Sequence, residues 1–272
     1  YGIIELINFA HGEIYMLGAF TALLVAGVLG IVGFPAGGIL IVAALAAVVW
    51  SAAYGYTLEK VAYKPLRGAP RLSPLISAIG MSIFLQNYVL LAQTSDYVPF
   101  PRLLPDMEFL DYLGNIMGPS DFLILVTSTL AMVSLSLFIR YTRMGKAMRA
   151  TAQNRKMALL LGINADRIIS LTFIVGSALA ALGGVLIASH MGQVNFGIGF
   201  LAGLKAFTAA VLGGIGSIPG AMVGGLVLGI AESMTTGYLS GNYEDALAFA
   251  LLILILIFRP DGILGKAKVQ KV

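Results

Sequence analysis

Cysteine is absent from this 272-residue chain, and histidine occurs only twice. The lack of cysteine excludes disulfides and thiolate metal sites, and two histidines alone do not make a structural zinc site. Charged residues are also scarce, at 11% of the chain, whereas a soluble domain carries about 25%. Apolar residues make up 58%, and the mean hydropathy is +0.92. Because so little polar surface cannot cover a water-soluble fold, the composition predicts a membrane protein.

Long apolar stretches indicate an all-α fold, a polytopic transmembrane helical bundle of about eight spans that forms a single domain over residues 1–272. A spanning helix needs about 20 mostly apolar residues, because the hydrocarbon core is about 30 Å thick. The stretch 199–214 is short, so it is either a full span or a re-entrant or broken segment. The expected spans are 14–32, 37–56, 73–93, 121–140, 168–189, 199–214, 219–238 and 244–259.

Basic residues gather in three segments that this topology places on one side of the membrane. The loops 57–72 and 140–167 and the C-terminal tail carry four, seven and four of them, which is fifteen of the 17 in the chain. The positive-inside rule predicts that this side is cytoplasmic. The pI of about 9.3 reflects the topology and does not indicate nucleic-acid binding. The other side receives Asp96, Asp106, Glu108, Asp111, Asp121, Glu244 and Asp245.

The loop 141–167, YTRMGKAMRATAQNRKMALLLGINADR, is too polar to span and has small and apolar residues at roughly helical spacing. Gly162 is a C-cap signal, and Asn164 is suited to be the N-cap of the following span. We therefore expect a short amphipathic helix, a glycine break and entry into the next span. From these residues alone, the helix either lies on anionic lipid or presents its small and apolar side chains to a soluble partner.

This loop resembles the EAA-type coupling loop of ABC importer permeases, an alanine-rich helix followed by a glycine. More closely, RATAQNRKMALLLGIN and the following LTFIVGSALAALGGVL resemble the permeases of high-affinity branched-chain amino acid ABC transporters, of the LivH type. The segments YGIIELINFAHGEIYMLGAF, LISAIGMSIFLQNY and FTAAVLGGIGSIPGAMVGG match the same family, so the resemblance covers nearly the whole chain. The family's first span is missing, and we expect it to precede Tyr1.

The resemblance implies a single transmembrane permease domain in a bacterial inner membrane, with 141–167 as its cytoplasmic coupling loop. It implies four kinds of partner: the lipid bilayer, a second permease subunit, two cytoplasmic ATP-binding subunits and an extracytoplasmic substrate-binding protein. No P-loop pattern occurs in the sequence, so we expect ATP hydrolysis on a partner and no cofactor on this chain. The residues that would dock into an ATP-binding subunit are Arg149, Ala150, Ala152, Gln153, Asn154, Met157, Ala158, Leu161, Gly162 and Asn164.

Polar groups within apolar spans are costly, so each is a candidate for the transport path. Glu5, Asn8, His11, Gly12 and Glu13 cluster in ELINFAHGE, just before a span. The segment is either a helix break that lines a cavity, as in transporters with discontinuous helices, or a solvated interfacial turn. The resemblance marks INFAHG as a family signature, which favours the helix break. His11 lacks partners at ligand spacing, so we expect no metal site.

Lys205 and Glu232 are charged residues inside the sixth and seventh expected spans. Each lies about 9 Å from the outer end of its helix at 1.5 Å rise per residue. We expect them to form an intramembrane ion pair or a shared polar network, unless Lys205 snorkels to the outer interface. The amides of Gln86, Asn87 and Asn195 either line the transport path or join helices through hydrogen bonds.

The resemblance implies a permease that moves leucine, isoleucine or valine into the cytoplasm by alternating access, driven by ATP. The competing interpretation is an ion-coupled secondary transporter of a small amino acid or amide, with Glu13 or Glu232 as its proton or cation site. That interpretation leaves the loop 141–167 unexplained. A membrane enzyme is not expected, because the sequence has no paired-carboxylate motif, nucleophile elbow or metal cluster.

Overall fold

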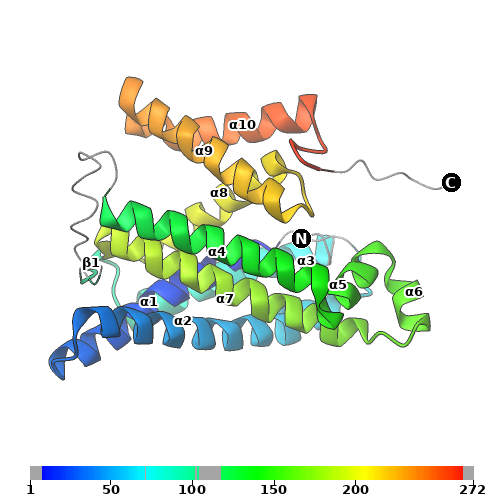
Figure 1. Cartoon of the computed structure of the whole chain (residues 1–272), viewed down its shortest axis with the longest axis horizontal. Helices are drawn as coiled ribbons and strands as arrows, with labels where there is room; N and C mark the ends of the chain where they lie inside the picture. Colours follow the sequence, from blue (N-terminus) through cyan, green and yellow to red (C-terminus); the bar gives the residue numbers. More distant parts are fainter. Residues whose placement is uncertain (1–7, 71, 102, 104–117, 266–272) are drawn as a thin grey trace.

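The computed structural model describes residues 8–70, 72–101, 103 and 118–265. Glu5, Arg71, Asp106, Glu108, Asp111 and the tail lysines Lys266, Lys268 and Lys271 lie outside them. The described helices are α1 His11–Ile31, α2 Ala36–Leu58, α3 Leu72–Ala92, α4 Pro119–Tyr141, α5 Arg143–Gln153, α6 Arg155–Leu160, α7 Ala165–Met191, α8 Ile198–Gly213, α9 Ile218–Tyr238 and α10 Glu244–Phe258 (Figure 1). Shorter elements are the π-helical turn Glu59–Tyr63, the 3₁₀ turns Lys64–Leu66 and Gly241–Tyr243, and the strands β1 Val98–Pro99 and β2 Gln193–Val194.

Seven of the described helical segments are long and apolar enough to cross a membrane, and α8, with 16 residues, is shorter. This confirms the predicted polytopic bundle of about eight spans. Apolar stretches of this kind form helices because lipid offers no hydrogen bonds, so each backbone N–H and C=O pairs within its own segment. The ends of the observed helices lie within a few residues of the expected ones.

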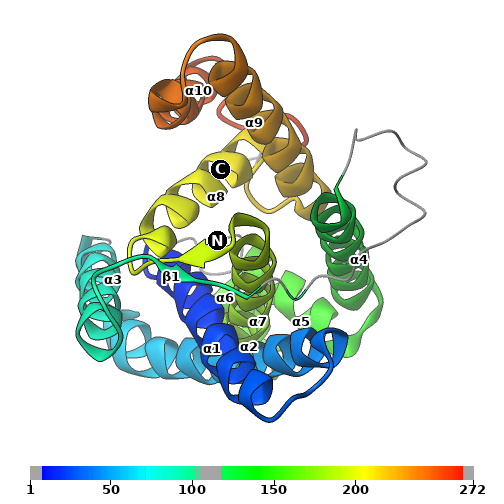
Figure 2. The same ribbon diagram turned by 90° about the vertical axis from the view of Figure 1, so that its left-hand side faces the viewer.

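Helices α1, α2 and α7 pack on one another, and α1 also contacts α8 (Figure 2). Small residues permit this approach. Gly18 lies against Ala181 of α7, and a Cβ on Gly184 would overlap the backbone of Tyr15. Since lipid gives helices no hydrophobic reason to associate, close van der Waals packing of this kind holds the bundle together.

Helix α8 begins at half the depth of the bundle. Gly199, in its first turn, packs against Gly12 and Glu13 of α1. Glu13 in turn bonds Ser82, which is the central residue of α3. From there α8 runs to the α9–α10 pair, which it contacts closely (Figure 2). Its 16 residues rise only about 24 Å, so the segment 199–214 is a short helix that starts inside the bundle.

Strands β1 and β2 form an antiparallel pair, with Val98 opposite Val194, at the end of the bundle opposite α5 and α6 (Figure 1). Val194 and Phe100 are buried, and Phe196 packs on the same apolar core around α1. The chain between α7 and α8 therefore folds inward. Irregular backbone is tolerated at this depth because protein covers it.

The described basic loops lie at one end of the bundle. Helices α5 and α6 and the C-terminal end of α10 are together there, while β1 and the start of α4 lie at the opposite end (Figure 1). The grouping agrees with the expected topology, in which the basic segments share one side.

Candidate functional site

The predicted coupling segment folds as two short helices, α5 and α6. Asn154 separates them: its backbone is extended, with φ −159°, and its side-chain oxygen caps α6 by accepting from the Met157 N–H at 3.1 Å. Gly162 follows α6 with φ +79°. At the start of α7, the Asn164 side chain accepts a hydrogen bond from the Arg167 N–H at 3.1 Å. The predicted glycine break and N-cap are both confirmed, and the division at Asn154 is new.

The exposed surface of α6 is mostly apolar, with Lys156 as a charged residue beside Leu159 and Leu160. The exposed fractions are 56% for Met157, 54% for Leu159, 82% for Leu160 and 76% for Leu161. We call these four residues the α6 apolar face. Contiguous exposed apolar surface of this kind marks a contact with protein or membrane.

The other predicted docking residues differ in exposure. Those that are exposed are Arg149, Gln153, Asn154, Gly162 and Asn164, and those that are half-buried are Ala150 and Ala152. Ala158 is only 1% exposed, because α6 packs on α5 and α7. The Ala158 side chain therefore faces the bundle in this structure, and its predicted docking role stays a prediction.

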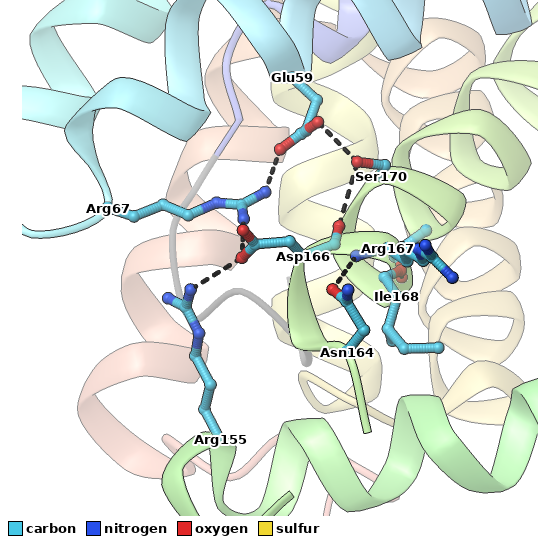
Figure 3. Close-up of polar contacts among 9 residues, drawn as sticks. Glu59, Arg67, Arg155, Asn164, Asp166, Arg167, Ile168 and Ser170 are labelled. Carbon is cyan, nitrogen blue, oxygen red and sulfur yellow. Dashed lines mark hydrogen bonds and ion pairs between the residues drawn. The ribbon is translucent and has the colours of Figure 1, made fainter. Parts of the chain in front are cut away.

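A charged network ties the α6–α7 junction to the link between α2 and α3 (Figure 3). Arg67 forms ion pairs with both Glu59 and Asp166. The second oxygen of Glu59 accepts from the Ser170 hydroxyl at 2.7 Å, and Arg155 approaches Asp166 at 3.2 Å. Because the Glu59 side chain is 0% exposed, Arg67 is the cation that balances a wholly buried carboxylate.

Sequence reasoning missed this network. Arg67 and Asp166 are 99 residues apart in the chain, and no periodicity connects them. The available signal was the presence of single acids, Glu59 and Asp166, in two segments that are otherwise basic.

A second polar cluster surrounds Glu13, in the first turn of α1. Its Oε1 accepts hydrogen bonds from Ser82 Oγ and Gln86 Nε2, both at 2.8 Å. Its Oε2 lies against Gly199 and has no hydrogen-bond partner within the described part of the chain. Helices α1, α3 and α8 thus meet at a carboxylate that is 0% exposed. Two of the predicted path residues, Glu13 and Gln86, are brought together here.

The residues around Glu13 in the same segment position α1. Asn8 accepts a hydrogen bond from the Tyr63 hydroxyl at 2.6 Å. His11 is half-buried, and its ring faces Gly176 of α7. Gly12 packs so closely on α8 that a Cβ would overlap the α8 backbone. The segment is therefore a helix start packed within the bundle.

The other two predicted amides form hydrogen bonds with nearby backbone. Asn87 is exposed, and its side-chain amide donates to the Ile83 carbonyl on its own helix at 2.8 Å. Asn195 lies in the turn before α8, where its side-chain oxygen accepts from the Gly197 N–H at 3.0 Å. The structure gives both side chains local contacts.

The predicted pair between Lys205 and Glu232 is present, within a larger cluster. The ammonium lies 3.3 Å from the Glu232 carboxylate and 3.2 Å from Asp245, and it also pairs with Glu244. Glu244 and Asp245 begin α10. The sequence indicated these two only as acids on the outer side, and the path of α8 toward α10 brings Lys205 to them.

Replacing Lys205 by methionine is expected to destabilise the protein by roughly 1.5–3 kcal/mol, because three carboxylates then face one another without a cation. Adding Glu232→Gln should recover only part of this loss, since Glu244 and Asp245 remain. Thermal unfolding in detergent micelles measures both variants against Glu232→Gln alone. Equal losses for Lys205→Met and Glu232→Gln would contradict a cluster centred on the lysine.

A family model and several relatives match nearly the whole chain. The model described as "Branched-chain amino acid transport system / permease component" matches residues 1–256. The chain is 52% identical to the high-affinity branched-chain amino acid transport system permease proteins LivH of Escherichia coli K12 and BraD of Pseudomonas aeruginosa, over 100% of this chain and 90% of each relative. It is 27% identical to a probable LivH permease of Methanocaldococcus jannaschii, over 95% of this chain and 82% of that protein.

No solved structure matches the chain. Among the described residues, no group of three or more His, Cys, Asp or Glu is placed to hold a metal ion. The sequence resemblance is confirmed by the family match and by the relatives. The chain therefore belongs to the family of permease components of branched-chain amino acid transport systems.

Proposed function

We propose that this chain is the membrane-spanning subunit of an ATP-driven importer in a bacterial inner membrane, and that it moves leucine, isoleucine and valine into the cytoplasm by alternating access. The observation that carries the proposal is the α6 apolar face, which is exposed at the end of the bundle where the described basic loops gather. An exposed apolar helix beside positive charge suits docking into a groove of a soluble partner at the cytoplasmic surface. The family and the names of the relatives support the substrate class.

In this proposal two ATP-binding subunits hydrolyse ATP, one of them against α5 and α6. A second permease subunit completes the membrane part, and an extracytoplasmic binding protein delivers the substrate. The docking surface combines the α6 apolar face with exposed neighbours such as Arg149 and Gln153, while Gly162 and Asn164 set the direction in which the chain enters α7.

In this proposal, motion passes from the docking helices to the buried carboxylate of Glu13 through a chain of contacts. Displacement of α5 and α6 would move Asp166. Because Arg67 pairs with Asp166, the link between α2 and α3 would move with it. Helix α3 follows that link and carries Ser82 and Gln86, which hold Glu13. Packed helices and ion pairs of this kind transmit motion when both ends have two arrangements.

Leu161→Glu is expected to reduce co-purification of the ATP-binding subunits roughly tenfold or more, because it places a charge in the centre of an apolar contact. The transport system is co-expressed, and the ATP-binding subunits recovered with this chain are quantified. Leu239→Glu is the matched control, since Leu239 is 74% exposed and Leu161 76%, and Leu239 follows α9 at the other end of the bundle. Undiminished recovery with Leu161→Glu would contradict the docking assignment.

An ion-coupled secondary transporter is the second candidate, and one observation favours it. Glu13 Oε2 is buried without a hydrogen-bond partner among the described residues, as expected of a proton or cation site. Uptake into proteoliposomes separates the two candidates. The ATP-driven importer continues to take up leucine when an ionophore collapses the ion gradients and stops when ATP is omitted, whereas the secondary transporter shows the opposite dependence.

A further inference from the structure

A pocket of about 550 Å³ lies next to the Glu13 cluster, lined by Phe9, which precedes α1, and by residues of α3 and of the start of α8. Its volume falls in the range of small-molecule sites, which is roughly 300–1,000 Å³. The apolar side chains among its walls are Phe9, Ile79, Ile83, Phe200 and Leu204. The polar side chains among the described lining residues are Ser82 and Gln86, the same two that hydrogen-bond Glu13.

The carboxylate behind these two side chains lacks a counter-charge. Glu13 is 0% exposed and forms no ion pair with any residue that the structure describes, and its Oε2 has no hydrogen-bond partner there. An uncompensated carboxylate in a membrane interior is costly and marks a functional site. Because the amide nitrogen of Gln86 is bonded to Glu13, its amide oxygen remains available to accept a hydrogen bond from a ligand. A cationic group in the pocket would contact that oxygen, with the buried Glu13 carboxylate behind Gln86.

The first turn of α8 offers the complementary charge. Gly197 and Phe200 line the same pocket. The first N–H groups of a helix have no acceptor within the helix, and the helix dipole gives that end partial positive charge. Helices that begin inside a membrane hold anionic substrate groups in this way. Glu13 Oε2 already lies against Gly199 in this turn, and the Gly197 N–H is bonded to Asn195. A ligand carboxylate would therefore meet the turn at Phe200, which lines the pocket.

We propose that the pocket is a binding site for one aliphatic α-amino acid. Its ammonium group lies against Gln86 with the charge of Glu13 behind, its carboxylate lies at the first turn of α8, and its side chain packs on Phe9 and Leu204. The inference rests on the proposed function and deepens it, because the pocket gives the transport path a defined resting position. Ile83 and Phe200 are 55% and 46% exposed, so the second permease subunit would complete the outer wall.

Cysteine labelling tests the site directly, since the chain has no cysteine of its own. The assembled complex, purified without the binding protein, carries either Ile83→Cys or Phe84→Cys. These neighbours on α3 are similarly exposed, at 55% and 60%, and only Ile83 is among the lining residues. Leucine at about ten times its dissociation constant should slow modification of Ile83→Cys by a methanethiosulfonate reagent roughly tenfold and leave Phe84→Cys unchanged.

Two further comparisons assign the roles of the groups. 4-Methylpentanoate has the side chain and carboxylate of leucine without its ammonium, so it should not protect Ile83→Cys. Glu13→Gln added to Ile83→Cys should abolish protection by leucine.

The contradicting outcomes are distinct. If leucine protects neither thiol, or protects both equally, the pocket is not the binding site. If 4-methylpentanoate protects Ile83→Cys, the ammonium position is wrong. Retained protection with Glu13→Gln overturns the role of Glu13. ATP-binding subunits are quantified in the same preparations, and their absence counts against the proposed function instead.

Discussion

Replacing Arg67 by alanine should destabilise the protein by about 3–5 kcal/mol, because it leaves a buried carboxylate without its cation. Glu59 is 0% exposed and Arg67 only 14%, so water cannot take over the role of the guanidinium. The same change cuts the link between Asp166 and the α2–α3 segment (Figure 3). Unfolding by SDS in micelles measures the loss of stability. In the assembled complex we expect ATP hydrolysis to continue with less leucine taken up per ATP.

Arg155→Ala is the matched control for Arg67→Ala. Arg155 also pairs with Asp166, but the two side chains are 42% and 46% exposed, so solvent screens this pair and its loss should cost little. The double change Glu59→Met with Arg67→Met should restore most of the stability, since it removes the buried charge together with its partner. If Arg67→Ala and Arg155→Ala unfold at the same SDS concentration, the buried ion pair of Arg67 with Glu59 contributes no more to stability than the exposed pair of Arg155 with Asp166.

Gly12→Ala is expected to cost about 1–3 kcal/mol and to abolish most transport, because the added methyl group cannot fit between α1 and α8. The new Cβ would overlap the Gly199 carbonyl oxygen and come within 2.9 Å of the Gly203 Cα, and both neighbours are backbone that cannot rotate away. The helices would have to separate beside Glu13. Leucine uptake and thermal unfolding in micelles measure the two effects.

Gly27→Ala provides the comparison on the same helix. Nothing lies within 4 Å of a Cβ placed there, so the change should be neutral or slightly stabilising through helix propensity. Any general effect of alanine in α1 appears in both variants, and only the crowding is specific to Gly12. Equal uptake by both variants would show that α1 and α8 do not pack as closely as described.

The helices of this protein were predictable from sequence because lipid imposes one rule on every span. A stretch of about 20 apolar residues must pair its own backbone, so hydropathy alone locates it. Lys205 and Glu232 were predictable as partners for a related reason: charges are so scarce within the spans that few pairings exist. Gly162 and Asn164 were predictable because their conformations depend on neighbours in the chain.

The remaining features depend on how helices that are far apart in the sequence pack against one another. Small residues at helical spacing indicated a packed face on α6 but not which side faces the bundle, and the structure places Ala158 on that side. Glu244 and Asp245 reach Lys205 only because the middle of α8 lies beside the start of α10. Nor could hydropathy show that α8 begins beside Glu13, since an apolar stretch has the same composition whether it stands upright or starts halfway across.

The start of α8 brings polar groups close to the middle of the bundle. Gly199 and Glu13 lie level with Ser82, at the midpoint of the 21 residues of α3. In a hydrocarbon core about 30 Å thick, a group at the midpoint has about 15 Å of apolar core on either side. From that point, a route to either face of the membrane is about half as long as a channel through the whole bilayer.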